Sequence, residues 1–242
     1  EREDIENEEK NANRDFDYYD LQLQAVRQAL SRFMPEFSNI RIRRSPLRMD
    51  VDKRINGNKI TLSVNQLSDG EKCLMAMVGD IVRRMTIANP QLSHPLLGQG
   101  IILIDEIDLH LHPLWQRDVV SRLTETFPNC QFIISTHSPH VITHVQKESL
   151  FSLDITADGL RSEHPQKSYG MTAERVLEDL MGLTTTRPVN IKNEIDDIYQ
   201  RIDRKEYDNA KKAIFLLERK IGADPDLLRA RTIILRKEAI DK

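Results

Sequence analysis

The sequence lacks the features of a secreted, membrane-spanning or disulfide-stabilised protein. Its only two cysteines, Cys73 and Cys130, fit neither a disulfide framework nor the spacing of a metal motif. Aliphatic runs such as residues 101–104 are far shorter than the roughly 20 apolar residues that cross a bilayer. We therefore expect a cytoplasmic protein without a membrane partner.

Aromatic residues are also scarce, at 5% of the 242 residues, whereas charged residues make up 30% and nearly cancel to a net charge of −3. This balance gives no general reason to expect nucleic acid or membrane binding. One local basic patch is different, because four arginines lie on or near predicted strands: Arg41, Arg43, Arg44 and Arg48. A solvated sheet face is the favoured interpretation, and contact with nucleic acid phosphates is the alternative.

A third absence concerns phosphate binding. No Gly-x-x-x-x-Gly-Lys-Ser/Thr segment, the loop that cradles nucleotide phosphates, occurs in the chain, and the chain does not begin with methionine. We expect such a loop to lie in an N-terminal lobe outside this sequence.

Hydrophobic periodicity predicts the first elements of the fold. Apolar residues recur at helical spacing over residues 21–33 and then alternate, as in half-buried strands, in three runs between residues 40 and 64. The dipeptide Asn56-Gly57 between the last two runs favours a type I′ hairpin turn. The pattern predicts an N-terminal helical segment, residues 1–35, and then an antiparallel β segment. The middle run places on its half-buried face Leu47, Met49 and Val51.

The next residues predict a βαβ unit. Ser68 is suited to cap a long helix. The aliphatic run 101–104 predicts a parallel strand that is buried on both faces. A crossover helix at residues 114–127 and a second parallel strand at residues 131–135 complete the unit.

The remaining residues predict a small hairpin around Asp158-Gly159 and then helices from residue 170 to the end. Gly222 is suited to end one of these helices and Asp224-Pro225 to begin the next. The predicted fold class is therefore α/β, with a mostly parallel sheet, flanking helices, an antiparallel β segment and a helical C-terminal appendage. The predicted domains are residues 1–35, 36–165 and 166–242.

The segment most specific for function is Ile101–Glu106, four aliphatic residues followed by two carboxylates. Ligands of open α/β sheets bind at the carboxyl ends of the strands, where these acids are predicted to lie. Asp105 is suited to hold Mg²⁺, because a hard cation prefers carboxylate oxygen. Glu106 is suited to polarise an attacking water. Taken alone, the segment also fits a strand that ends in an acidic helix cap.

Two further segments fit phosphate chemistry. Ser68 and Gly70, at a predicted helix start, offer backbone N–H groups and the positive end of the helix dipole to an anion. His137, directly after the second parallel strand, is placed to donate to a phosphate oxygen. Taken separately, an ordinary N-cap and a structural histidine are the better interpretations.

The order of the three segments in one βαβ frame resembles the ABC ATPase family. Leu67–Lys72 is similar to the signature motif, Ile101–Glu106 to Walker B, Asp108 to the D-loop and His137 to the switch histidine. The resemblance implies a homodimer that closes head to tail around ATP and Mg²⁺, with the signature motif acting in trans. The implied nucleotide-binding residues are Ser68, Gly70, Glu71 and Asp108. The implied Mg²⁺ ligand is Asp105, and the implied catalytic residues are Glu106 and His137.

The runs DEIDLHLHP, residues 105–113, and STHSP, residues 135–139, are similar to the OLD-like and RecF-like branch of that family. Within this branch, the tail from residue 170 most resembles the ATPases of Septu-type phage-defence systems, which also occur beside retrons. The resemblance implies an ATPase core at residues 36–165 and a helical domain at residues 166–242. The implied partners are further copies of the chain, an HNH nuclease and, in retron-associated forms, a reverse transcriptase with its msDNA.

Other functions stay open. The principal alternative is a RecF-like repair ATPase whose closure grips DNA. An OLD-type nuclease needs strand-borne carboxylates, whereas the acidic pairs of this tail lie in predicted helices or caps. A scaffold without catalysis is disfavoured by the intact Glu106. His110 and His112 are weak metal candidates, because no third ligand lies at a sensible spacing.

Overall fold

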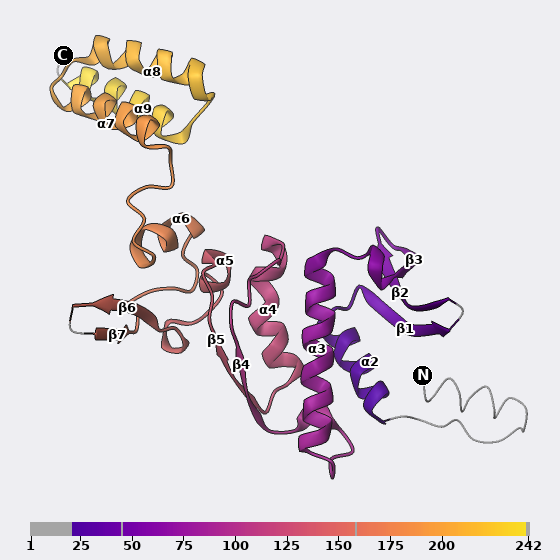
Figure 1. The fold of residues 1–242 in the computed structure, drawn as a ribbon. Helices are drawn as coiled ribbons and strands as arrows, with labels where there is room; N and C mark the ends of the chain where they lie inside the picture. Colours follow the sequence, from indigo (N-terminus) through magenta and orange to yellow (C-terminus); the bar gives the residue numbers. More distant parts are fainter. Residues whose placement is uncertain (1–20, 45, 158, 241–242) are drawn as a thin grey trace, which may run out of the picture. The chain divides into compact units, whose positions relative to one another are not determined.

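The computed structural model describes residues 21–44, 46–157 and 159–240, which form two compact units that divide between Ala173 and Glu174 (Figure 1). Residues 1–20 of the predicted N-terminal segment and Asp158 of the predicted hairpin turn lie outside the described residues. The division into three functional domains stays a prediction.

The first unit combines parallel and antiparallel β-structure with helices. Its helical elements are α2 (Leu21–Phe33), η1 (Val64–Gln66), α3 (Asp69–Ala88), η2 (Pro95–Leu97), α4 (Pro113–Thr126), α5 (Pro139–Ile142) and η3 (Lys147–Ser149). Its strands are β1 (Phe37–Arg44), β2 (Leu47–Ile55), β3 (Asn58–Ser63), β4 (Gly100–Ile104), β5 (Cys130–Ile134), β6 (Ser152–Thr156) and β7 (Gly159–Glu163). Strands β1–β3 and β6–β7 are antiparallel, and β4 and β5 are parallel. The predicted α/β class is confirmed.

The three-stranded sheet contains the predicted hairpin. Asn56 and Gly57 have φ angles of 50° and 82°, which a type I′ turn requires and which these residue types tolerate. The turn pairs Ile55 with Asn58, and the register continues without a shift to the pair of Asp50 with Ser63, over the whole length of β3.

The prediction for the buried face of β2 was wrong in part. Val51 is buried, but Leu47 is 72% exposed, and the residues buried beside Val51 are the carboxylates Asp50 and Asp52. Alternation predicts that every second residue shares a face, but it cannot show that cations on neighbouring strands make a charged residue stable on the inside.

Each buried carboxylate of β2 is surrounded by cations. Asp50 lies 2.6 Å from Nε of Arg43 and 3.0 Å from Nε of Arg48. Asp52 lies 3.1 Å from Nη2 of Arg41. Arg41, Arg43 and Arg48 of the predicted basic patch are therefore ion-paired with carboxylates of this strand, which explains why the sheet accepts so many positive charges.

Asp52 is the most heavily bonded of these groups. It also accepts hydrogen bonds from Thr61 Oγ1 at 2.6 Å and from Asn39 Nδ2 at 2.8 Å, and Lys59 Nζ lies 2.9 Å away. The bonds from Thr61, Lys59 and Asn39 hold the pKa of its carboxyl well below the ordinary value.

We expect the Asp52→Asn variant to melt at a lower temperature than the parent at pH 7. A carboxyl whose folded pKa is depressed stabilises the fold above its unfolded pKa, about 3.9, and loses that contribution as the pH falls toward the folded value. The difference in melting temperature between parent and variant should therefore narrow from pH 7 to pH 3. Asp154→Asn, on the exposed strand β6, is the control. A gap that stays constant with pH contradicts the expectation.

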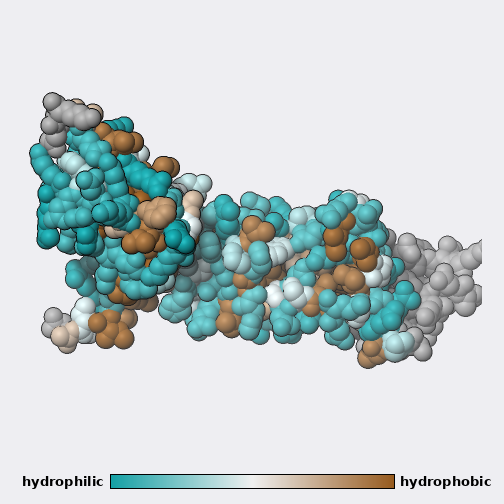
Figure 2. All heavy atoms as spheres, turned by 90° about the horizontal axis from the view of Figure 1, so that it is seen from above, coloured by the Kyte–Doolittle hydropathy of each residue, from teal (hydrophilic) through white to brown (hydrophobic). Residues whose placement is uncertain are grey.

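The parallel pair β4–β5 is covered on one face. Its inner side chains, among them Ile102 and Phe132, pack on a core to which α2, α3 and α4 contribute. Its outer side chains Ile101, Leu103 and Ile133 are 66%, 73% and 54% exposed. The prediction of a strand buried on both faces was therefore wrong for the described residues, because helices pack on only one side of the pair. Figure 2, seen from above, shows hydrophobic patches among mostly hydrophilic residues on the surface.

The second unit is helical. After α6 (Ala173–Arg175) come the π-helical turn η4 (Val176–Leu180) and three longer helices, α7 (Val189–Asp203), α8 (Tyr207–Ile221) and α9 (Pro225–Ile240). The isoleucine stripe of α7 packs with apolar residues of α8 and α9. Gly222, with φ 85°, ends α8 as predicted. Arg187 then binds Asp224 at 2.7 Å and Asp226 at 2.8 Å, which ties the start of α9 to the segment before α7.

Candidate functional site

The predicted signature segment forms the start of α3. Ser68 is the N-cap, and its Oγ accepts a hydrogen bond from Glu71 N at 3.3 Å. Glu71 Oε2 in turn accepts from Ser68 N at 3.0 Å, which completes a capping box. The serine that the sequence placed before the helix is thus held by a reciprocal pair of bonds.

Glu71 is engaged on both carboxylate oxygens. Lys53 Nζ, on β2, lies 2.5 Å from Glu71 Oε1, and the same ammonium lies 5.3 Å from the centre of the Phe37 ring. Burial raises the pKa of Glu71, but the bonds from Lys53 and Ser68 outweigh it and hold that pKa below its ordinary value. Both carboxylate oxygens of Glu71, a predicted nucleotide-binding residue, are therefore already bonded within the chain. No pattern in the sequence pointed to Lys53.

Gly70 lies against the loop that follows β4. A Cβ atom placed on Gly70 would come within 2.6 Å of the His110 carbonyl oxygen and 3.6 Å of Leu111 Cα. His110 has a φ of 62°, so its backbone adopts the left-handed conformation at this contact. The start of the signature helix is therefore in backbone contact with residues 107–111, the loop that contains the predicted D-loop residue Asp108 and that is called the D-loop below.

The two Walker B carboxylates lie just beyond the end of β4 and are exposed. The Ser135 hydroxyl donates to Asp105 Oδ1 and accepts from Glu106 N, the latter at 2.8 Å. Glu106 has a φ of 49°, uncommon for a residue with a side chain, and the Ser135 contact helps to hold this turn. Ser135 was not among the predicted site residues, although its place after the neighbouring strand was a usable signal.

Asp108 binds the loop after β5 rather than pointing away from it. Its Oδ1 accepts from the Thr136 hydroxyl and from His137 N, the latter at 3.3 Å. The His137 side chain is exposed. Because Ile104 pairs with Ile134 in the parallel register, the loops that carry Asp105, Glu106, Asp108 and His137 leave the sheet at one edge.

The donor set suits Mg²⁺ better than a transition metal. Within residues 21–44, 46–157 and 159–240, no three His, Cys, Asp or Glu side chains group together as a cage. Mg²⁺ commonly binds one or two carboxylates together with water and substrate phosphates. Asp105 can supply such a carboxylate. His112 instead caps α4, where its Nδ1 accepts from Leu114 N at 3.3 Å.

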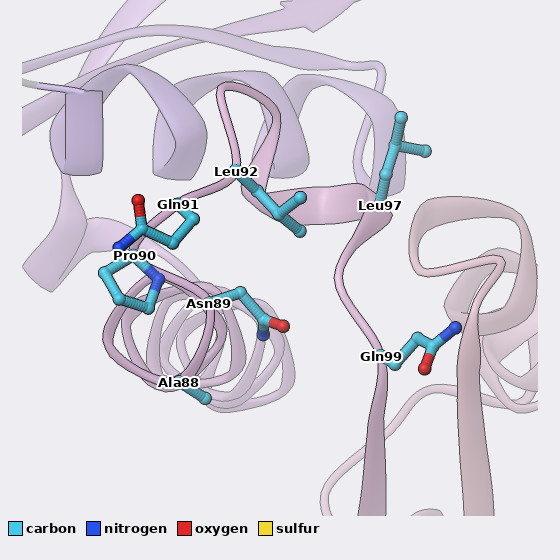
Figure 3. Close-up of a pocket in the computed structure, with 7 residues that line it drawn as sticks. All are labelled: Ala88, Asn89, Pro90, Gln91, Leu92, Leu97 and Gln99. Carbon is cyan, nitrogen blue, oxygen red and sulfur yellow. The ribbon is translucent and has the colours of Figure 1, made fainter.

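A separate hollow of about 420 Å³ lies at the opposite end of α3 (Figure 3). It is lined by Ala88, Asn89, Pro90, Gln91, Leu92, Leu97 and Gln99. The Asn89 amide already donates to Met85 O at 3.0 Å. Since a helix of 20 residues is about 30 Å long, this hollow is remote from Ser68 and includes none of the predicted site residues.

Comparison with known families decides the class of the chain. Residues 1–143, more than half of its length, match the AAA_21 family, described as "AAA domain, putative AbiEii toxin, Type IV TA system". The chain belongs to this family. Membership in AAA_21 makes it an ATPase-type domain, as the motifs predicted.

Individual relatives of this AAA_21 chain come from retron and Septu systems. It is 38% identical over 209 residues to "Retron Ec83 probable ATPase" of Escherichia coli, which covers 85% of the chain and 37% of the relative. It is 46% identical over 140 residues to "Retron Vc95 probable ATPase" of Vibrio cholerae serotype O1 biovar El Tor; this alignment covers 58% of the chain and 27% of the relative. It is 35% identical over 125 residues to "Septu protein PtuA" of Bacillus thuringiensis, which covers 50% and 32%.

The predicted resemblance to Septu-type and retron-associated ATPases is confirmed by these matches. The chain spans between 27% and 37% of the length of these three relatives. In the described part of the AAA_21 chain, no helix is long and apolar enough to cross a bilayer.

Proposed function

We propose that this chain is the ATP-binding and ATP-hydrolysing part of a subunit in an antiphage defence system. In this proposal the subunit forms a homodimer around ATP and Mg²⁺, assembles further, and controls an associated HNH nuclease. The matches to a Septu protein and to retron ATPases support the defence assignment. Because the chain covers at most 37% of these relatives, the proposal concerns the full-length protein.

The observation that carries the proposal is the edge where β4 and β5 end. Two exposed carboxylates, Asp105 and Glu106, lie there beside the loop that bears His137, and Ser135 and Asp108 bind the two loops together. Asp105 is the proposed Mg²⁺ ligand. Mg²⁺, when bound, neutralises charge on the phosphates.

The other residues at this edge have separate proposed roles. Glu106 accepts a hydrogen bond from the attacking water and orients it toward the terminal phosphate. His137 donates to an oxygen of that phosphate, for which its exposed side chain is available.

The signature helix is proposed to act on the nucleotide of the opposite protomer. The first N–H groups of α3 and its dipole favour an anion at Ser68 and Gly70. Glu71 is proposed to act there by holding the Ser68 backbone in place, since both of its oxygens are already bonded.

Partner control is proposed from the resemblance to Septu-type and retron-associated ATPases. An HNH nuclease is the proposed partner and, in a retron-associated system, a reverse transcriptase with its msDNA. The RecF-like clamp remains the alternative, but the sheet cations that would favour DNA contact are paired with Asp50 and Asp52.

We expect Ser68→Arg to abolish ATP-driven dimerisation of the full-length protein, because a long cation replaces the small N-cap where the partner's phosphates bind. Mass photometry with and without ATP, after co-expression with the genomic neighbours, measures both oligomer and partner. Ser121→Arg, on the exposed face of α4, is the matched control.

Two outcomes decide against parts of the proposal. Dimerisation that survives Ser68→Arg contradicts the trans role of the signature helix. A protein that purifies without a nuclease and dimerises only with both ATP and DNA favours the repair clamp.

A further inference from the structure

One side chain, Gln116, spans the two loops of the candidate site. It lies in α4, is half-buried, and its Nε2 donates to the carbonyl oxygens of Asp108 at 3.2 Å and Leu111 at 3.0 Å. Its Oε1 accepts from the Ser138 hydroxyl at 2.8 Å. A single amide thus joins the D-loop segment after β4 to the loop after β5.

Ser138, at the far end of this link, is itself held by several hydrogen bonds. Its side chain is buried, and its Oγ accepts from His140 N at 3.1 Å and Val141 N at 3.4 Å as the N-cap of α5. Its own N–H donates to Thr136 Oγ1 at 3.0 Å. His137 therefore lies between two residues that are fixed by this network.

The orientation of the Gln116 amide is determined by its partners. Both D-loop partners are carbonyl oxygens, which only accept, so the NH₂ group must face them. The oxygen then faces Ser138, whose hydroxyl hydrogen is free to point at it while its lone pairs serve the α5 cap. All three bonds are compatible only with a neutral amide at this position.

The D-loop end of the link also touches the signature helix. Leu111, whose carbonyl Gln116 binds, follows His110, whose own carbonyl fills the space where a Gly70 Cβ would lie. Contacts therefore run without interruption from the start of α3, through the D-loop and Gln116, to the residues on either side of His137.

We propose that Gln116 is a positioning residue that couples the signature helix and D-loop to the loop of His137. The inference rests on the proposed ATPase function and assigns a role to a residue outside the motifs. Gln116 touches no nucleotide in this scheme. It fixes His137 relative to Glu106, so its loss lowers kcat, whereas KM for ATP and ATP-driven dimerisation stay close to the parental values.

Two variants of the full-length protein test this coupling. Gln116→Met keeps the length of the side chain but makes none of the three bonds. Gln116→Glu keeps the acceptor for Ser138 but cannot donate to the D-loop carbonyls. Because misplacing catalytic groups by about 1 Å costs up to about a hundredfold in rate, we expect kcat to fall about tenfold or more in both. Gln131→Glu, at an exposed position of β5, is the control.

Hydrogen exchange provides a readout that does not depend on turnover. In the parent, ATP should protect residues 107–111 and 136–138 together, whereas in both variants protection of the second segment should be weaker, because only the bonds to Asp108 and within the loop still hold it. Parental kcat in Gln116→Glu, or a raised KM with unchanged kcat, overturns the coupling role. Parental joint protection of the two segments in both variants overturns it as well. If one variant folds poorly, the result of the other variant decides.

The same experiment separates this inference from the function on which it rests. A parental protein that neither hydrolyses ATP nor shows ATP-dependent protection overturns both. A parental protein that does so, with variants that match it, overturns the role of Gln116 alone.

Discussion

Replacing Glu106 by glutamine is expected to reduce ATP hydrolysis by roughly a hundredfold or more, while ATP-bound dimers accumulate. The amide has the same shape as the carboxylate, and the Glu106 N–H to Ser135 bond is a backbone contact that survives the change. What is lost is the negative oxygen that orients the attacking water. ATP binding and dimer closure depend on other groups. The ATPase cycle should therefore stop at the closed, ATP-bound dimer, before hydrolysis.

The Glu106→Gln experiment needs two measurements on one sample. Phosphate release gives the hydrolysis rate, and mass photometry with ATP gives the dimer fraction. Glu125→Gln, the same substitution on the exposed surface of α4, should leave both at parental values. Hydrolysis at the parental rate in Glu106→Gln removes this residue from the catalytic role.

Gly70→Ala should have the second large effect, on stability and on dimerisation together. Its Cβ would lie 2.6 Å from the His110 carbonyl oxygen, and because that atom belongs to the backbone, the D-loop or the start of α3 must move. Overpacking of this kind typically costs about 1–3 kcal/mol. The movement also displaces the N–H groups proposed to face the partner's nucleotide.

Gly79→Ala is the matched control for this variant. It lies in the same helix, but nothing within 4 Å would meet its Cβ. Because alanine favours a helix over glycine by roughly 0.5–1 kcal/mol, this control should melt at or slightly above the parental temperature. Equal melting temperatures and equal ATP-driven dimerisation in the two alanine variants would show that the Gly70 contact is unimportant.

Local sequence signals predicted the elements well where one short segment determines its own conformation. The Asn56-Gly57 turn, the Ser68 cap and the Gly222 helix end all depend on residues next to one another, and all three are confirmed. The isoleucine stripe of α7 likewise reports a buried face directly.

The errors arose where a residue's environment comes from distant parts of the chain. Asp52 is buried because its partners come from the two strands on either side of β2, and no local pattern shows that register. Ile101 and Leu103 were predicted buried from their aliphatic run, but burial depends on what packs against the sheet, which the run does not encode.

The candidate site shows the same difference between residues that local motifs identify and residues whose role depends on distant parts of the chain. The motifs named Asp105, Glu106, Asp108 and His137, and parallel pairing then brings their loops to one edge of the sheet. The supporting residues were missed, because Lys53 and Gln116 matter through bonds to groups that no motif places beside them.

The contact at Gly70 also limits how a defect there can be repaired genetically. Every other amino acid carries a Cβ, and the atom that it would strike is a carbonyl oxygen that no exchange of the His110 side chain removes. A suppressor of Gly70→Ala must therefore shift the backbone of the loop or of the start of α3. His110→Gly is a natural place to find one, because glycine at this left-handed position, with φ 62°, gives the loop the freedom to move its carbonyl aside.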